Sequence, residues 1–230
     1  MLELLKQQVC DANLKLVSEG LVIQTWGNVS GVDRESGHLV IKPSGVPYAD
    51  MKPEHMVVLD LESGEVVEGD LRPSSDTPTH LILARAFPHI GGIVHTHSLY
   101  ATAWAQAKMD LPAFGTTHAD YFHGAVPCTR AMTPEEIADD YEANTGHVII
   151  ERFAELEAED FPGVLVASHA PFTWGKTPDK AVENAAVLEQ VARLASETLR
   201  IKADLEEMQS ELLDKHFLRK HGKNAYYGQK

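Results

Sequence analysis

The sequence is poor in cysteine, in basic charge and in long apolar segments. Its two cysteines, Cys10 and Cys128, are too few for a disulfide-stapled secreted domain and fit the reducing cytoplasm. With 20 Lys and Arg against 34 Asp and Glu, the formal net charge is −14, which argues against a nucleic-acid partner because phosphate backbones require a basic surface. A local basic pocket for a small anion remains compatible with that charge.

Segments that would target or divide the chain are also missing. No apolar run approaches the length of a membrane span, and residues 1–7 mix charges with apolar side chains, unlike a signal peptide. We therefore expect a cytoplasmic protein without a membrane partner. No linker, low-complexity tract or repeat interrupts the 230 residues, so we expect a single domain over residues 1–230.

Hydrophobic spacing predicts a mixed α/β chain. The predicted helices cover residues 2–19, 78–87, 99–107, a segment opened by Thr133, 145–158 and 179–200. The predicted strands cover residues 21–25, 38–42, 56–60, 91–97 and 164–168. Because strands and helices do not alternate strictly, we do not expect a simple doubly wound sheet.

Histidines at two predicted strand ends indicate a metal site. His95 and His97 are two residues apart, and side chains at that spacing on a strand share a face. His169 ends the second apolar run. Three imidazoles suit zinc, with Mn²⁺ and Co²⁺ as alternatives. Asp76 is either a fourth ligand or the cap of the helix that begins near Pro78; the sequence leaves both interpretations open.

Short polar segments offer groups that bind phosphate. Lysine and arginine supply charge, hydroxyls and amides supply donors, and glycine lets the backbone approach an anion. Each segment taken alone is equally well explained as a turn or a helix cap. The candidate phosphate-binding residues are Gly27, Asn28, Lys42, Ser44, Gly45, Ser74, Ser75 and Arg219.

Asp120 is a candidate acid/base group, and the tyrosines of the C-terminal tail are candidates for docking on a surface. Asp120 stands in a polar cluster and is either a general base or a loop cap. Tyr226 and Tyr227 are unusual in a tail, where aromatic residues normally need a surface to dock on. Packing is the alternative role for both tyrosines.

Seven segments together resemble the L-ribulose-5-phosphate 4-epimerases, a family within the class II aldolase/epimerase superfamily. They follow one another in the order of the family's motifs and with similar spacing. The segments are TWGNVS at 25–30, IKPSG at 41–45, PSSDTPTH at 73–80, GIVHTHS at 92–98, TTHADY at 116–121, LDKHFLRKHG at 213–222 and AYYGQ at 225–229.

The resemblance implies a fold, a reaction and roles for the candidate residues. It implies a three-layer domain with a central, mostly antiparallel sheet flanked by helices, as in class II aldolases. It implies interconversion of L-ribulose 5-phosphate and D-xylulose 5-phosphate by cleavage and re-formation of the C3–C4 bond. Asp120 and Tyr227 would be the acid/base pair, with His216 beside them, and a divalent metal would be held by His95, His97, His169 and Asp76.

The resemblance also implies an oligomer. Members of the family are cyclic homotetramers in which the tail tyrosine reaches the site of a neighbouring subunit, so we expect active sites shared between subunits. The substrate would be a small phosphorylated ketopentose.

Three other functions stay open from the sequence. A sugar-phosphate aldolase or a dehydratase of the same fold would share most of these residues, although such aldolases place glutamate where this chain has Asp76. A non-catalytic domain of this fold would have lost ligands or acid/base groups, and none is missing. The pathway, arabinose or ascorbate breakdown, cannot be read from the sequence.

Overall fold

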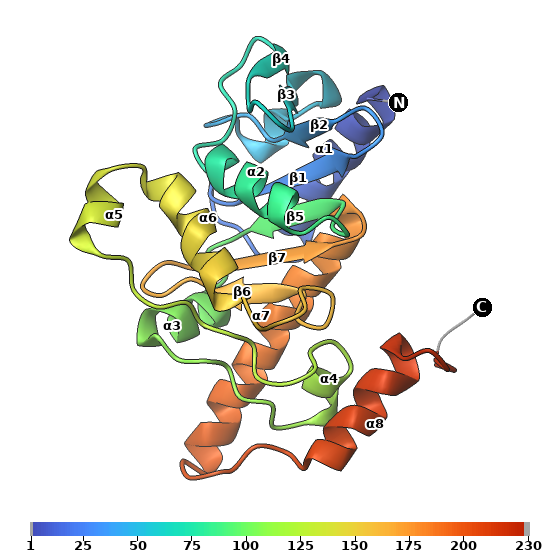
Figure 1. The fold of residues 1–230 in the computed structure, drawn as a ribbon, viewed down its shortest axis with the longest axis vertical. Coiled ribbons are helices and arrows are strands. Elements are labelled where there is room, and N and C mark those ends of the chain that lie inside the picture. The colour runs from blue at the N-terminus through green and yellow to red at the C-terminus, as the bar shows by residue number, and fades with distance from the viewer. Residues whose placement is uncertain (1, 228–230) are drawn as a thin grey trace.

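A computed structural model describes residues 2–227 of the chain (Figure 1). Its centre is a seven-stranded sheet with the order β4-β3-β2-β1-β5-β7-β6. All six pairings between neighbouring strands are antiparallel. The strands are β1 (Asn28–Asp33), β2 (His38–Ile41), β3 (Val57–Asp60), β4 (Val66–Glu68), β5 (Gly92–His95), β6 (Gly163–Leu165) and β7 (Pro171–Gly175).

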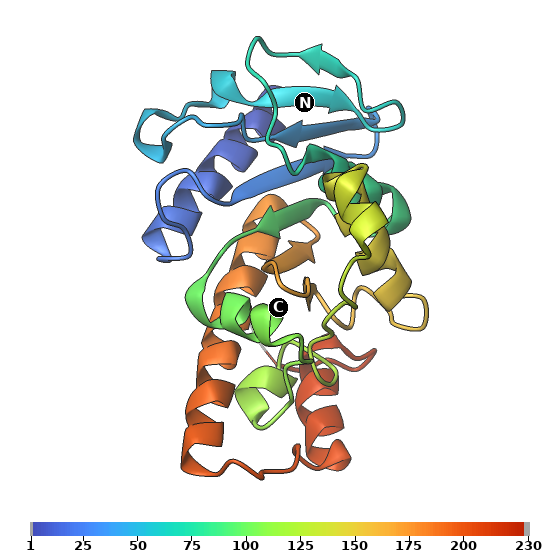
Figure 2. The ribbon, with the colours of Figure 1, turned by 90° about the vertical axis from the view of Figure 1, so that its left-hand side faces the viewer.

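Helices cover both faces of this sheet, which confirms the expected antiparallel, three-layer α/β fold (Figures 1 and 2). One face carries α1 (Leu2–Ser18) and α7 (Pro178–Ile201), and the other carries α2 (Thr77–Ala86) and α6 (Tyr141–Arg152). The remaining helices are α3 (Leu99–Ala107), α4 (Thr116–Ala119), α5 (Pro134–Ala138) and α8 (Ser210–His221), with 3₁₀ turns η1 (Tyr48–Asp50) and η2 (Pro53–His55). Within residues 2–227, no helix is both long and apolar enough to cross a membrane.

Two hydrophobic layers, one on each face of the sheet, hold these elements together. Leu81 and Leu83 of α2 pack with Ile149 of α6 against the sheet. On the other face, Leu16 of α1 and Val182 of α7 are fully buried, with exposed fractions of 0%. Because α7 packs along β5 and β7, it supports the strands that carry or flank the candidate metal ligands.

The strand predicted over residues 21–25 is wrong. This segment forms a turn in which the Trp26 amide donates to the Ile23 carbonyl over 3.1 Å. Gln24 and Gly27 both have positive φ angles, 55° and 81°, which are incompatible with an extended strand. The first strand, β1, begins only at Asn28.

Several other boundaries differ from the sequence prediction by a few residues. β5 ends at His95 and β6 ends at Leu165, so His97 and His169 lie in the loops that follow. Helix α6 begins at Tyr141 rather than at residue 145. Strands β1, β4 and β7 and helices α4 and α8 were not predicted. The capping box at Thr133 and Glu136 is confirmed.

Candidate active site

Three histidine rings meet at the end of the central strand β5. His95 closes β5 and pairs with Phe172 of β7 in register, and the two rings stack with centroids 4.3 Å apart. The His95 ring centroid lies 4.9 Å from that of His97 and 4.8 Å from that of His169. One potential ligand atom from each of the three histidines lies within 4.8 Å of the others. The strand end and two loops therefore bring together the three residues predicted as ligands.

The chemistry of these histidines fits a divalent metal. The ring Nδ1 of His95 lies 3.0 Å from the Pro171 carbonyl; since a carbonyl only accepts, Nδ1 carries the proton and Nε2 keeps a free lone pair. Burial lowers the pKa of His95 to about 4 and also lowers the pKa of His97 and of His169. Neutral imidazole is the form that binds metal. The Nδ1 of His169 is buried and has no hydrogen-bond partner among residues 2–227.

Asp76 faces the same site and does not cap its helix through its side chain. It occupies the N-cap position of α2, but its carboxylate accepts no bond from the helix amides within the described chain. The Asn28 amide instead donates to its Oδ2 over 2.6 Å. Burial by itself would raise the pKa of Asp76, but nearby His95 and His80 and the Asn28 bond lower it below its ordinary value. Its role as a fourth metal ligand stays a prediction.

A polar hollow of about 560 Å³ adjoins the histidines. It is lined by Asp76, the three histidines and seven of the eight predicted phosphate-binding residues. Those seven residues are Gly27, Asn28, Lys42, Ser44, Gly45, Ser74 and Ser75.

Lys42 is the cation of this hollow. It follows β2, is 2% exposed, and its Nζ lies 5.1 Å from the centre of the Tyr48 ring. Nζ donates long bonds, 3.3 and 3.4 Å, to the carbonyls of Thr25 and Pro43. Burial lowers the pKa of Lys42, and the charge of Asp76 partly opposes this effect. Among residues 2–227 the hydrogen-bond partners of this buried ammonium are carbonyls, and such a cation is well suited to bind an anion.

Position 27, where the hollow meets β5, has space only for glycine. A side chain there would place its Cβ 2.9 Å from the His95 carbonyl oxygen, and its φ angle is 81°. The Tyr48 hydroxyl donates to the carbonyls of Trp26 and Gly27, each over 2.9 Å. The loop before β1 is thus held close to the candidate metal site.

Tyr141 and Glu142 also line the hollow, and the sequence analysis missed both. They begin α6, and the Glu142 carbonyl accepts a bond from the Thr79 hydroxyl of α2. The Tyr141 and His169 ring centroids are 6.0 Å apart. The capping box at Thr133 predicted a helix in this part of the chain. That helix is α5, however, and the residues that line the hollow belong to the next helix, α6.

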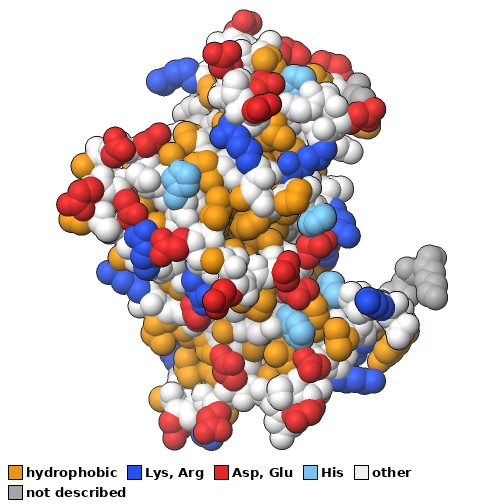
Figure 3. Space-filling model, viewed as in Figure 1, with side chains coloured by type: hydrophobic (Ala, Val, Ile, Leu, Met, Phe, Trp, Pro, Cys, Tyr) orange, Lys and Arg blue, Asp and Glu red, His pale blue; other side chains and the backbone are white. Residues whose placement is uncertain are grey.

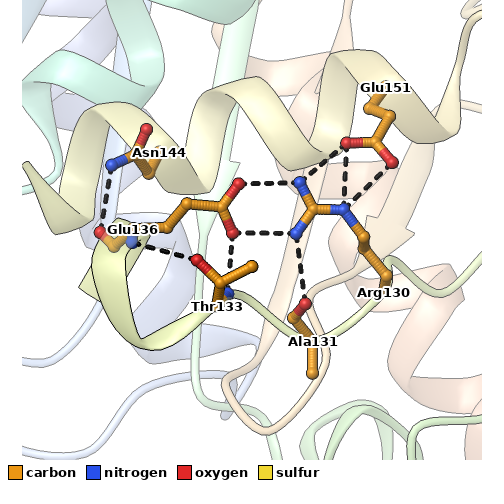
Figure 4. Close-up of polar contacts among 6 residues, drawn as sticks. All are labelled: Arg130, Ala131, Thr133, Glu136, Asn144 and Glu151. Atoms are coloured by element: carbon orange, nitrogen blue, oxygen red, sulfur yellow. Dashed lines mark hydrogen bonds and ion pairs between the residues drawn. The ribbon is translucent and has the colours of Figure 1, made fainter.

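Arg130 joins helices α5 and α6 through its guanidinium (Figure 4). Arg130 donates to both oxygens of Glu136 over 2.7 and 2.8 Å and through Nε to both oxygens of Glu151, each over 3.0 Å. The Asn144 amide donates to the Glu136 carbonyl over 3.0 Å. These bonds hold α5 against α6, and the first turn of α6 lines the hollow.

The other four predicted residues gather in a second cluster on α4 and α8. Asp120, His216, Arg219 and Tyr227 contact one another there, and among residues 2–227 none of them lines the hollow. Both ribbon views place α4 and α8 toward the lower end of the long axis, whereas β1 and β2, next to Asn28 and Lys42, lie in the upper half (Figures 1 and 2). The acid/base candidates of one chain, together with Arg219, are therefore separate from its metal candidates and from the other seven phosphate candidates.

Comparison with known proteins defines the class. The family model for the class II aldolase and adducin N-terminal domain matches residues 7–196. This chain belongs to that family.

Similar proteins within this family include epimerases and aldolases that act on sugar phosphates. The chain is 58% identical over 226 residues to the L-ribulose-5-phosphate 4-epimerase UlaF of Salmonella paratyphi A and to that of Salmonella typhi, covering 98% of this chain and 99% of each relative. Among solved structures, an L-fuculose 1-phosphate aldolase superposes with a TM-score of 0.78 at 26% identity, covering 92% of this chain and 93% of that one. A sugar-phosphate aldolase from Thermotoga maritima shares the fold, with a TM-score of 0.66 at 19% identity and coverage of 86% and 95%.

Proposed function

We propose that this protein is a metal-dependent epimerase that interconverts L-ribulose 5-phosphate and D-xylulose 5-phosphate. The observation that carries the proposal is the three-histidine cluster beside a buried lysine and a polar hollow, in a chain 58% identical to proteins named as such epimerases. The hollow offers Lys42, hydroxyls and glycine amides for the phosphate, and the histidines adjoin it.

The stereochemical change is best explained by breaking a carbon–carbon bond. The hydrogen on C4 is not next to the carbonyl and is therefore not acidic, and the sequence has no dinucleotide-binding fingerprint for an oxidation and reduction. Removal of the proton from the C4 hydroxyl allows C3–C4 to break, with the bond electrons passing to C3. The fragments are the enediolate of dihydroxyacetone and glycolaldehyde phosphate. Rotation of the aldehyde, attack by C3 on its other face and return of the proton give the epimer.

The residues of the hollow would keep the aldehyde in place during this rotation. Lys42, Ser44 and Ser75 would hold the phosphate, because an escaping fragment would turn the enzyme into an aldolase. A divalent ion held by His95, His97 and His169, with Asp76 nearby, would act as a Lewis acid that stabilises negative charge on substrate oxygens.

The acid/base groups would come from a neighbouring subunit. Inversion needs a proton carrier on each face of the aldehyde, and we assign Asp120 and Tyr227 to the two faces, with His216 bonded to Asp120. Since these residues lie outside the hollow of their own chain, a second copy must supply them. A cyclic homotetramer, in which each interface joins different surfaces, would complete every site.

The direct test is the reaction. The protein, loaded separately with Zn²⁺, Mn²⁺ or Co²⁺, is incubated with L-ribulose 5-phosphate, and the products are separated. We expect D-xylulose 5-phosphate. Accumulation of dihydroxyacetone and glycolaldehyde phosphate instead would identify an aldolase, and no turnover with any ion would reject both activities.

Mixed oligomers test the shared site. Tyr227→Phe keeps the ring but removes the hydroxyl, so we expect almost no epimerisation and an intact fold. Mixed with His97→Asn chains, it should regain about a quarter of wild-type activity in a cyclic tetramer with random order, because one chain supplies an intact metal half and the next an intact acid/base half.

The matched control is a mixture of Tyr227→Phe with Asp120→Asn chains. The family resemblance led us to expect that the tail tyrosine reaches the site of a neighbouring subunit, but Asp120 and Tyr227 both lie beside Arg219 on one chain. This mixture should therefore stay inactive. Activity in this control, or none in the first mixture once mass spectrometry shows mixed tetramers, would contradict the shared site.

The remaining assignments are proposals of the same kind. We propose zinc as the resident ion, the cytoplasm as the location, and residues 1–230 as one domain. The ion is tested by metal analysis of protein purified without added metal.

A further inference from the structure

Arg219 binds the Asp120 carboxylate through the Nε and Nη2 edge of its guanidinium. Its Nη2 donates to both carboxylate oxygens, over 2.9 and 3.0 Å, and its Nε donates to Oδ1 over 3.2 Å. His216 Nδ1 lies 3.1 Å from the same Oδ1, and Lys220 Nζ lies 3.4 Å from Oδ2. A two-pronged guanidinium–carboxylate pair fixes orientation as well as charge.

The same arginine also holds the tail. Its guanidinium lies 4.6 Å from the centre of the Tyr227 ring, and its carbonyl accepts bonds from the amides of Tyr226 and Tyr227 over 3.0 and 3.2 Å. Lys220 Nζ is 4.9 Å from the Tyr227 ring centre. One turn of α8 therefore contacts both proposed acid/base residues.

The surroundings of Asp120 keep it ionised. Partial burial alone would raise the pKa of Asp120, but bonds from His216 and Arg219 and the charges of Lys220 and Arg219 lower it below its ordinary value. The side chains of Asp120 and Arg219 are 15% and 22% exposed. Lys220 also lies over the Tyr121 ring, whose hydroxyl donates to Glu183.

His221 faces Asp120 from the same helix. Its Nε2 lies 2.9 Å from the Asp120 backbone carbonyl. Acidic, basic, histidine and hydrophobic side chains lie side by side over the α8 end of the molecule (Figure 3), and the basic ones that contact the Asp120 side chain are Arg219 and Lys220. The carboxylate thus sits in a basic environment although the whole chain carries a net charge of −14.

We propose that Arg219 is a positioning residue for the acid/base pair and not a ligand of the substrate phosphate. This inference rests on the proposed epimerase function. The Nε and Nη2 edge of the guanidinium is already engaged by the carboxylate, so a phosphate bound in the same two-pronged way would have to displace Asp120. Arg219 holds the carboxylate and the Tyr227 ring in one arrangement, ready to meet the hollow of a neighbouring copy.

The first test separates turnover from phosphate binding. Arg219→Met, Arg219→Lys and Lys42→Met are compared for kcat, for KM and for inhibition by inorganic phosphate. We expect Arg219→Met to lower kcat by about tenfold or more with little change in phosphate inhibition. Arg219→Lys keeps the charge without the fork and should fall between Arg219→Met and wild type. Lys42→Met should instead weaken phosphate inhibition and raise KM.

The second test is the pH profile of kcat. Burial raises the pKa of Asp120 and the Arg219 charge lowers it. Without that charge, the pKa of Asp120 should rise. Asp120 then becomes protonated at a higher pH, and the acid limb of the profile moves upward by about one pH unit or more. An unmoved acid limb would overturn the proposal, even if kcat falls, because a merely structural loss does not shift this limb.

A double-mutant cycle distinguishes an effect that Arg219 exerts through Asp120 from a general loss of folded structure. If Arg219 acts through Asp120, then Arg219→Met should change kcat much less in an Asp120→Asn background than in wild type. Equal effects in both backgrounds, or a raised KM with weaker phosphate inhibition and normal kcat, would overturn the proposal. Wild type that does not turn over L-ribulose 5-phosphate would instead refute the proposed function itself.

Discussion

Asn28 connects the two halves of the hollow through one side-chain amide. Its Nδ2 donates to Asp76 over 2.6 Å and to the Ser74 hydroxyl over 3.0 Å. In the sheet, Asn28 stands opposite His95. Asn28, at the start of β1, therefore bonds both to a candidate phosphate-binding residue, Ser74, and to a candidate metal ligand, Asp76.

Lys42→Met should raise KM strongly while metal content stays unchanged. The lysine is buried, and loss of a charge-assisted bond to phosphate costs about 1.5–3 kcal/mol, roughly a 10- to 150-fold rise. The matched control is Lys52→Met, since the Lys52 side chain is 63% exposed, and its KM should equal that of wild type. An unchanged KM in Lys42→Met would place the phosphate elsewhere.

His97→Asn should lower bound zinc and activity together. It removes one of three imidazoles whose ligand atoms lie within 4.8 Å of one another, and an amide is a far weaker zinc ligand. Zinc per chain is measured after gel filtration, beside His147→Asn, in which an exposed histidine of α6 is changed. Full zinc occupancy in a folded His97→Asn protein would remove the metal site from the proposal.

At the scale of elements, the site depends on how closely β5 approaches helix α7. A Cβ at Gly92 would lie 2.5 Å from the backbone nitrogen and Cα of Pro178, the first residue of α7. Backbone atoms cannot move aside as a flexible side chain can. The start of α7 therefore packs directly on Gly92, where there is no space for a side chain.

Gly92→Ala should destabilise the fold by about 1–3 kcal/mol or more, because the strand and helix must separate. Urea unfolding followed by circular dichroism measures the loss. Gly115→Ala is the control, since among the described residues no atom lies within 4 Å of its added Cβ. A Gly92→Ala protein as stable as that control would show that α7 shifts without cost.

At the scale of the whole molecule, buried neutral histidines make stability depend on pH. His118 is 4% exposed and lies 2.7 Å from the Gly124 carbonyl through Nε2. Burial lowers its pKa to about 4, although the Gly124 bond opposes the shift. The unfolded chain takes up this proton near pH 6.5, so between about pH 6.5 and 4 the unfolded state binds more protons, and stability falls as the pH falls.

His118→Gln should therefore flatten the dependence of stability on pH. The glutamine amide can still donate to Gly124 but does not titrate, so wild type should lose about 2 kcal/mol more than the variant between pH 7 and 5. The measurement is urea unfolding at both pH values with a chelator present. His147→Gln should keep the wild-type slope, and parallel slopes for wild type and His118→Gln would contradict the assignment.

The sequence alone determined the residue types and most of the elements. Strong helical periodicity located α1, α2, α3 and α7 because it is a local property. The histidines, lysine and serines were recognisable because metal and phosphate binding require those groups. The turn at residues 21–25 was missed because Gln24 takes a positive φ angle there and Gly27 does so just after it, which an apolar run does not reveal.

Only the tertiary structure decided which residues meet. His97 and His169 lie beyond their strands, so loop geometry, not strand alternation, brings them to His95. Tyr141 and Glu142 reach the hollow because α6 packs on α2, a contact between distant segments. Arg219 carries the same charge in either role, and only the fold shows that its fork is bonded to Asp120. Such choices depend on long-range packing, which no local pattern in the sequence encodes.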